Sequence, residues 1–239
     1  TCAADELEAH PDPDPSFSLI EQSPAGVTWT HNIRSGDFGY LDAEGIFHPQ
    51  VYIEYADSGP DDLRELVTID EIHVWILGRG GIYRIPVADL DPLTTIHTGQ
   101  GILDDESIDY RFTPISLAED IHDFDIVDDY VWWVGNVGEY GVYRLALDDP
   151  QGTPEFMWDL ADDFGEPVSE FTRDMKIAAG PDRLWFLIPT ISPTIRSYRF
   201  NGNLIETIPV VSNGSVVPVD MTVERDSGAL AIAGRATGT

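Results

Sequence analysis

A tryptophan-centred strand recurs along this chain at a nearly regular interval. The tryptophans lie in short runs of β-branched and aromatic residues, and they are Trp29, Trp75, Trp132 and Trp185. Successive members are 46, 57 and 53 residues apart, and a fifth copy, 229-ALAIAGRA-236, keeps the strand without the tryptophan. Self-similarity at such a period predicts a repeat protein in which each unit packs on its neighbours.

A tyrosine–arginine pair marks the strand after three of these tryptophans. The pairs are Tyr83–Arg84, Tyr143–Arg144 and Tyr198–Arg199, and Tyr40 takes this place in the first copy. Because side chains alternate along a strand, each Tyr and its Arg are expected on opposite faces. We expect one of them to pack while the other reaches a polar partner, and we expect the tryptophans to pack between units rather than to stack on a ligand.

Each copy divides into four short strands separated by turn residues. The predicted strands are 17–21, 27–32, 38–42 and 51–55, then 65–69, 72–77, 81–87 and 93–98, then 123–128, 130–135, 141–147 and 155–160, then 174–179, 184–188, 195–200 and 204–210. Turns are predicted at 23–26, 180–182, 201–203 and 226–228, and the best helix candidate lies around 159–166. Four antiparallel strands per unit predict an all-β fold, a β-propeller with four full blades and a partial fifth.

The pattern of these hairpins resembles a known group of propellers. The phrase hydrophobic-Trp-hydrophobic-x-Gly, followed by Gly-hydrophobic-Tyr-Arg, is similar to the blades of two-component-regulator, NHL-type, YncE and lactonase-like propellers. The resemblance covers residues 17–236 and implies the propeller fold. No active-site motif of these families is matched, so it implies no catalytic residue. The wider spacing between Trp75 and Trp132 predicts longer loops there.

Residues 1–16 differ in composition from the repeat region 17–239. They form an acidic, proline-spaced segment with no periodicity, which predicts a flexible tether before the propeller domain. The last copy stops after its second strand, so we expect the natural protein to continue beyond Thr239. The alternative is a compact five-bladed ring with a thin last blade.

Cys2 is the single cysteine, so no internal disulfide can form. A cysteine at the head of an acidic tether resembles a mature bacterial or archaeal lipoprotein, although Thr1 precedes it. This resemblance implies a lipid anchor on Cys2 and an extracytoplasmic, membrane-tethered protein. The alternative is an unmodified thiol. No run of 18 apolar residues occurs, so the sequence predicts no membrane-spanning helix.

The chain is strongly acidic, with 43 Asp and Glu against 13 Lys and Arg and a net charge of −30. Such a charge repels phosphate backbones, which argues against nucleic-acid binding. Lys176 is the only lysine. Acidity with almost no lysine indicates a salt-adapted or GC-rich organism, and several calcium sites are the alternative.

Charged residues are expected where the loops lead into the innermost strand of each blade. They are Arg64, Glu65, His122, Asp123, Arg173, Asp174 and Asp220. At one mouth of the channel they would bind a ligand, with Arg64 and Arg173 as the candidates for an anion. The alternative is a polar rim filled with water.

No motif predicts a cofactor. The histidines lack zinc spacing, and the acidic clusters 57–62, 103–107, 123–129 and 159–166 do not match a calcium loop. A calcium ion on the central axis, held by several blades, stays open.

The sequence favours a non-catalytic module that binds a protein or a glycan through rigid faces and variable loops. The segments 99–116 and 159–172 would form that face. An accessory subunit of a membrane complex is a second interpretation. The rival is a lactonase- or hydrolase-type enzyme with an axial divalent metal.

Overall fold

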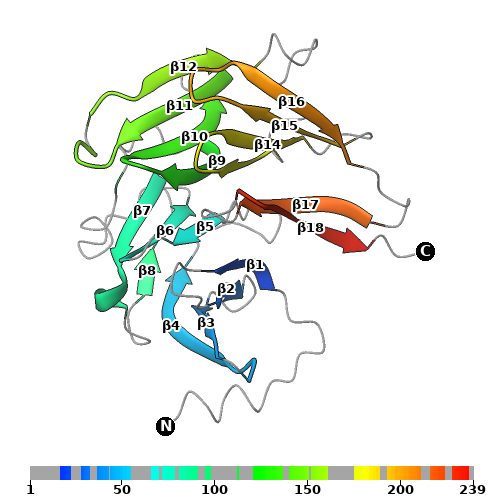
Figure 1. Ribbon diagram of the computed structural model, residues 1–239. Coiled ribbons are helices and arrows are strands. Elements are labelled where there is room, and N and C mark those ends of the chain that lie inside the picture. Colours follow the sequence, from blue (N-terminus) through cyan, green and yellow to red (C-terminus); the bar gives the residue numbers. More distant parts are fainter. Residues whose placement is uncertain are drawn as a thin grey trace.

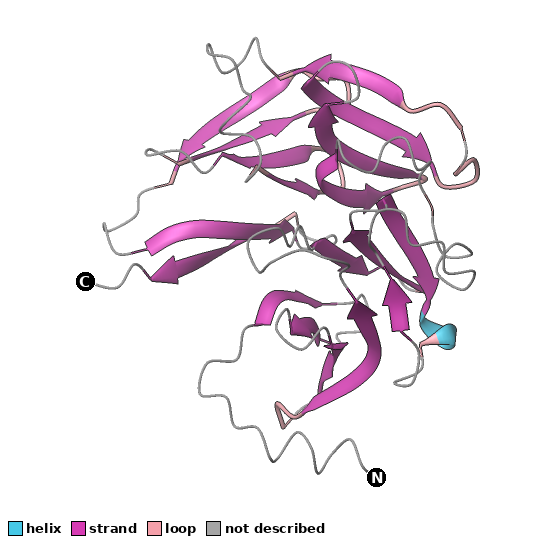
Figure 2. Cartoon of the chain, turned by 180° about the vertical axis from the view of Figure 1, so that it is seen from behind, coloured by secondary structure: helices cyan, strands magenta, loops and turns pink. Residues whose placement is uncertain are grey.

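The computed structural model consists of short β-strands (Figure 1). It describes residues 17–22, 28–32, 37–42, 44–54, 66–69, 72–78, 81–90, 95–97, 112, 121–136, 140–150, 152–160, 175–188, 193–210, 216–223 and 228–236. Within these residues the one helical segment is the 3-10 turn η1 (Val87–Asp89), coloured cyan in Figure 2. No described helix is long and apolar enough to cross a membrane. The candidate helix around 159–166 lies mostly outside the described residues.

The strands form five sheets that follow one another along the chain. Sheet 1 contains β1 (Phe17–Gln22), β2 (Thr28–Asn32), β3 (Asp37–Leu41), β4 (Phe47–Glu54) and β8 (Thr95–His97). Sheet 2 contains β5 (Leu66–Ile69), β6 (His73–Gly78) and β7 (Gly81–Pro86). Sheet 3 contains β9 (Ile121–Val127), β10 (Tyr130–Asn136), β11 (Tyr140–Ala146) and β12 (Glu155–Asp159). Sheet 4 contains β13 (Lys176–Ala179), β14 (Leu184–Ile188), β15 (Thr194–Tyr198) and β16 (Leu204–Pro209), and sheet 5 contains β17 (Val216–Val223) and β18 (Leu230–Ala236).

The first strand of each sheet lies innermost. Contacts join β1 to β5, β5 to β9, β9 to β13 and β13 to β17. In Figure 1 the sheets spread outward from these strands around a common centre, in the order of the chain. This is the radial arrangement of blades that the repeat predicted.

The fourth strand predicted for the second copy, 93–98, is the main departure from the predicted pattern. Its described part, β8, pairs in parallel with β4 of sheet 1 and not with β7 of sheet 2. Phe112 takes the outer edge of β7 instead, because its backbone N–H donates to the carbonyl oxygen of Ile82 at 2.7 Å. Side-chain alternation fixes which face of a strand is buried, but not which sheet edge the strand joins.

Three apolar clusters fill the spaces between neighbouring sheets. Trp75 lies in the cluster between sheets 2 and 3, Trp132 in that between sheets 3 and 4, and Trp185 in that between sheets 4 and 5. The predicted packing role of these tryptophans is confirmed. Trp133 is buried in the cluster on the other face of sheet 3 from its neighbour Trp132, as alternation along β10 requires.

The arginines of the Tyr–Arg pairs follow the prediction in sheets 2 and 3. Arg84 lies opposite Trp75 and Arg144 opposite Trp132 in the strand register, and each guanidinium lies within 6 Å of the indole centroid. Sheet 4 differs, since Ser197 stands opposite Trp185 and Arg199 is displaced by two residues. There Arg183, from the turn before β14, supplies the cation over Trp185 at 5.5 Å.

The Asn-Gly-Asn turn predicted at 201–203 joins β15 to β16 as expected. Gly202 has φ +84°, a left-handed conformation that glycine adopts without strain. The Gly202 N–H donates to the carbonyl oxygen of Arg199 at 2.9 Å. A β-carbon at Gly202 would lie 3.0 Å from the indole of Trp158 in sheet 3. The glycine therefore allows the turn and lets a neighbouring sheet pack closely.

Candidate functional site at the inner strands

The structure describes three of the predicted mouth residues. His122 and Asp123 are the second and third residues of β9, the innermost strand of sheet 3, and Asp220 lies in β17, the first strand of sheet 5. Sheet 4 lies between these two sheets, because β13 contacts both β9 and β17. The other predicted site residues, Arg64, Glu65, Arg173, Asp174 and Cys2, lie outside the described residues.

Asp123 is buried and holds two sheets together. Its Oδ1 accepts the N–H of Phe124 at 2.8 Å, and its Oδ2 accepts the N–H of Ile177 in β13 at 2.7 Å. Asp123 is 3% exposed. The two amide donors offset the cost of removing its carboxylate from water.

Asp125 repeats this arrangement two residues further along β9. Its Oδ1 accepts the N–H of Ile126 and its Oδ2 accepts the N–H of Ala179, both at 2.7 Å. The amides of Ile177 and Ala179 belong to the innermost strand of sheet 4, on the edge that no described strand pairs with. We call Asp123 and Asp125 the carboxylate clamp, because they satisfy this edge and join β9 to β13.

The sequence predicted Asp123 as a ligand-binding residue and did not predict that Asp125 joins β9 to β13. A signal was present, since two aspartates at positions i and i+2 of an apolar strand project to the same side. An acidic pair inside a buried strand requires donors, and the free amides of a neighbouring inner strand provide them. In the structure both carboxylates are occupied by the protein's own backbone.

His122 precedes the clamp and contacts sheet 3 itself. Its ring centroid lies 5.8 Å from that of Tyr140, the first residue of β11. His122 is half-buried. The pair gives this end of sheet 3 an aromatic and polar character.

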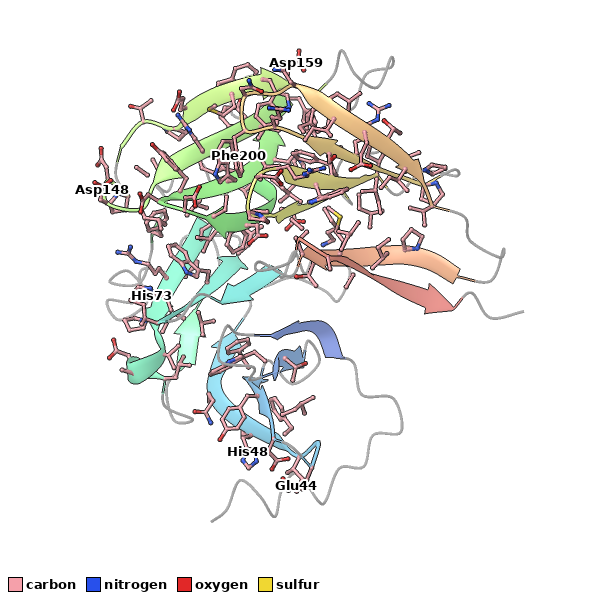
Figure 3. The ribbon with its side chains drawn as sticks, viewed as in Figure 1. Glu44, His48, His73, Asp148, Asp159 and Phe200 are labelled. Carbon is pink, nitrogen blue, oxygen red and sulfur yellow. The ribbon has the colours of Figure 1, made fainter. Side chains whose placement is uncertain are left out.

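A second polar cluster lies on the outer part of sheet 1, at the β3–β4 turn (Figure 3). Asp42 accepts the N–H groups of Glu44 and Ile46 on Oδ1, and its Oδ2 lies 2.8 Å from Nε2 of His48. The His48 ring stacks on Tyr40 with centroids 5.0 Å apart. The hydrogen bond with His48 is the main reason that the pKa of Asp42 lies below its ordinary value. These contacts are internal to the turn and stabilise it.

The described residues contain no group of three or more His, Cys, Asp or Glu side chains that could hold a metal ion. Of the acidic clusters named above, 57–62 and 103–107 lie outside the described part of the chain, as does most of 159–166. The cluster 123–129 is described, and its first two aspartates form the clamp. The alternative of an axial calcium ion held by other residues is not tested by the described part of the chain.

Comparison with known proteins shows the fold but assigns the chain to no family. No family model matches the sequence, and no curated protein matches it. A streptogramin B lyase structure aligns with 94% of this chain at 18% identity and a TM-score of 0.50, and a gluconolactonase from Xanthomonas campestris aligns with 92% at 13% identity and a TM-score of 0.50. PorZ, a surface component of the type-IX secretion system of Porphyromonas gingivalis, aligns with 95% at 12% identity and a TM-score of 0.48.

These likenesses show that the chain has the β-propeller fold. The chain spans 64% of the lyase, 71% of the gluconolactonase and 26% of PorZ. Proteins of similar fold thus include a lyase and a gluconolactonase. A shared fold at this level of identity does not transfer an activity.

Proposed function

We propose that this β-propeller is a non-catalytic binding or assembly module, exported and tethered to a membrane through Cys2, whose partner is a protein or a glycan. The observation that carries the proposal is that Asp123 binds backbone amides of the protein itself. An enzyme with an axial metal needs carboxylates that converge on the channel with free oxygens. Asp123 lies on the innermost strand of sheet 3, and each of its two carboxylate oxygens accepts a hydrogen bond from a backbone amide.

The charge and the architecture support the same proposal. Rigid blades present loops of variable length on fixed faces, which suits the docking of a partner. The net charge of −30 favours a partner with a basic surface and disfavours nucleic acid. An accessory subunit of a membrane complex would be one form of such a module.

A lactonase- or hydrolase-type enzyme with an axial divalent metal is the second candidate. The observation in its favour is the likeness in fold to a streptogramin B lyase and a gluconolactonase. In that case the metal ligands would come from loops outside the described residues, together with Asp220 on β17.

Metal content and thermal stability separate the two candidates. We expect the purified protein to contain no stoichiometric divalent ion by elemental analysis, and its unfolding temperature to stay unchanged after treatment with a chelator. A stoichiometric ion whose removal lowers the unfolding temperature would favour the enzyme and overturn the binding module as stated.

Attachment through Cys2 has a separate test. In cells that express the gene with its native upstream sequence, the wild-type protein should be recovered in the membrane fraction. The Cys2→Ala variant should be recovered in the soluble extracytoplasmic fraction, because one residue would carry the whole anchor. Equal distribution of the two proteins would exclude the lipid anchor.

A further inference from the structure

The turn between β15 and β16 carries an Asn-Gly dipeptide on the surface of the protein. Asn201 is exposed, and Gly202 follows it with φ +84°. Because a glycine has no β-carbon to shield its backbone nitrogen, this nitrogen can approach the side-chain amide of the asparagine before it. Asparagine is among the thermolabile residues of proteins. The dipeptide is therefore a candidate site of covalent modification.

The reaction is an intramolecular displacement at the side chain of Asn201. The backbone nitrogen of Gly202 loses its proton to hydroxide and attacks Cγ of Asn201. A C–N bond forms, and the side-chain nitrogen takes up a proton from water and leaves as ammonia, so that a succinimide ring joins the two residues. Water then opens the ring at one or the other carbonyl carbon. One opening gives aspartate, and the other gives isoaspartate, in which the main chain runs through Cβ and Cγ.

Two hydrogen bonds of the turn act on the two reacting groups. The N–H of Asn203 donates to Oδ1 of Asn201 at 3.2 Å, and this oxygen is where negative charge develops during the attack. The N–H of Gly202 donates to the carbonyl oxygen of Arg199 at 2.9 Å, which holds the attacking nitrogen within the turn. The first hydrogen bond favours the attack, whereas the second must break before it. The rate therefore depends on how often Gly202 separates from Arg199.

Packing against sheet 3 keeps the turn closed on both sides of Asn201. The ring of Phe200, labelled in Figure 3, lies 5.4 Å from that of Trp132 and packs against the cluster between sheets 3 and 4. A β-carbon at Gly202 would lie 3.0 Å from the indole of Trp158, so the backbone of this glycine is in contact with the ring. Asn201 lies between these two contacts and remains exposed.

We propose that Asn201 is a site of deamidation and isoaspartate formation whose rate is set by the packing of Trp158 on Gly202. This inference does not rest on the proposed binding function. Conversion to aspartate would keep the turn, because a carboxylate oxygen accepts the N–H of Asn203 as Oδ1 does now. Isoaspartate would lengthen the main chain, so the hydrogen bond of the Arg199 N–H to the carbonyl oxygen of Asn203 would be lost. The modification would then loosen sheet 4 from sheet 3.

Asn203 provides an internal control in the same turn. It is exposed like Asn201, but Leu204 follows it, and the side chain of a leucine hinders access to its own backbone nitrogen. The whole protein and a synthetic peptide of residues 193–210 would be incubated at mildly alkaline pH. Peptide mapping by mass spectrometry would locate the acid, and enzymatic methylation would detect isoaspartate.

We expect the amide of Asn201 to be converted in both samples, to aspartate and isoaspartate, and Asn203 to remain intact. Conversion of Asn201 should be at least ~10-fold slower in the whole protein than in the peptide, because the turn of the folded protein must open first. Substitution of Asn201 by serine should abolish the isoaspartate signal from this segment of the chain, which would confirm its position.

Two variants of β12 test whether packing sets the rate. Trp158→Ala should raise the rate at Asn201 by ~3-fold or more, since it removes the ring that contacts Gly202. Phe156→Ala is the matched control and should leave the rate unchanged. Phe156 is 39% exposed on the same strand and stands opposite Tyr143, which packs in the cluster between sheets 2 and 3. Urea unfolding of each variant gives the fraction that is globally unfolded.

Four results would contradict the proposal. Asn201 could remain intact over many half-lives of the peptide, or react as fast in the folded protein as in the peptide. The rate could be the same in the wild type and in Trp158→Ala. The rates of all variants could follow their globally unfolded fractions alone, which would exclude control by the local packing. None of these results would change the outcome of the metal and chelator test, so the two proposals fail independently.

Discussion

The same repeat builds the boundary between sheets 3 and 4 and the boundary between sheets 4 and 5. The two boundaries differ in how far their outer strands are buried. Both bury a tryptophan from the second strand, Trp132 in one and Trp185 in the other. The first boundary is covered out to Trp158 of β12, whereas the second leaves Ile208 of β16 exposed. The comparison shows that the inner strands suffice to bury the tryptophan, while the outer strands need the outer half of the next sheet.

The polar groups at the two boundaries also differ in how far they are exposed to solvent. Between sheets 3 and 4 the carboxylate clamp binds backbone amides, and Asp123 is almost fully buried. Sheet 4, on its side toward sheet 5, carries an ion pair of Arg183 with Asp182 and Glu206, whose carboxylates are more than a third exposed. The hydrogen bonds between sheets 3 and 4 are thus shielded, whereas the ion pair on the face of sheet 4 toward sheet 5 is one that water and salt can weaken.

The largest expected effect comes from removing the clamp. Asp123→Ala should lower the free energy of unfolding by about 2–4 kcal/mol, because two hydrogen bonds to a charged group are lost and the buried amide of Ile177 keeps no acceptor. The measurement is urea unfolding followed by tryptophan fluorescence.

Asp148→Ala is the control for the clamp. Asp148 is an exposed aspartate of the β11–β12 connection, at the edge of sheet 3 in Figure 3, and its loss should change stability by less than about 0.5 kcal/mol. If Asp123→Ala were as stable as Asp148→Ala, the clamp would not hold the two sheets together.

The next largest effect is expected from truncating two equivalent residues, Trp158 of β12 and Ile208 of β16. Trp158→Ala should cost about 2–3 kcal/mol, since it opens a space over Tyr198 and Gly202. Ile208→Ala should cost at most about 1 kcal/mol, since Ile208 is 38% exposed. Urea midpoints of the two variants would be measured in parallel. Equal losses would mean that Ile208 is covered in solution.

The sequence allowed the architecture to be predicted because the constraints on it are local. Trp75, Trp132 and Trp185 at a regular interval predicted the packing between sheets, and the Asn-Gly-Asn turn at 201–203 formed as expected. The alternation of apolar residues fixed which face of each strand is buried.

Other features depend on contacts between distant segments and leave no local pattern. The strand at 95–97 joins sheet 1, and Phe112, fifteen residues later, takes the edge of β7. The role of Asp123 depends on an amide of Ile177, 54 residues away in the chain. Among the predicted mouth residues that the structure describes, Asp123 has contacts that assign it a role, and that role is to connect sheets 3 and 4.

The smallest expected effect tests the exposed ion pair at the boundary that stays open. The pKa of Asp182 lies below its ordinary value of 3.8, chiefly because Arg183 donates hydrogen bonds to the carboxylate, while burial acts weakly in the opposite sense. A lowered pKa means that the folded state favours the charged form. The stabilisation is therefore present above about pH 4 and is lost as the pH falls through the lowered pKa.

We expect Asp182→Asn to lower stability at pH 7 by no more than about 0.5 kcal/mol, because both side chains of the pair are in contact with water. The difference in urea midpoint between wild type and variant should shrink in 1 M salt, and it should also shrink as the pH falls through the lowered pKa of Asp182. The loss caused by Asp123→Ala should persist in 1 M salt, since Asp123 is only 3% exposed. If salt reduced both losses alike, the two boundaries would not differ in the shielding of their polar contacts.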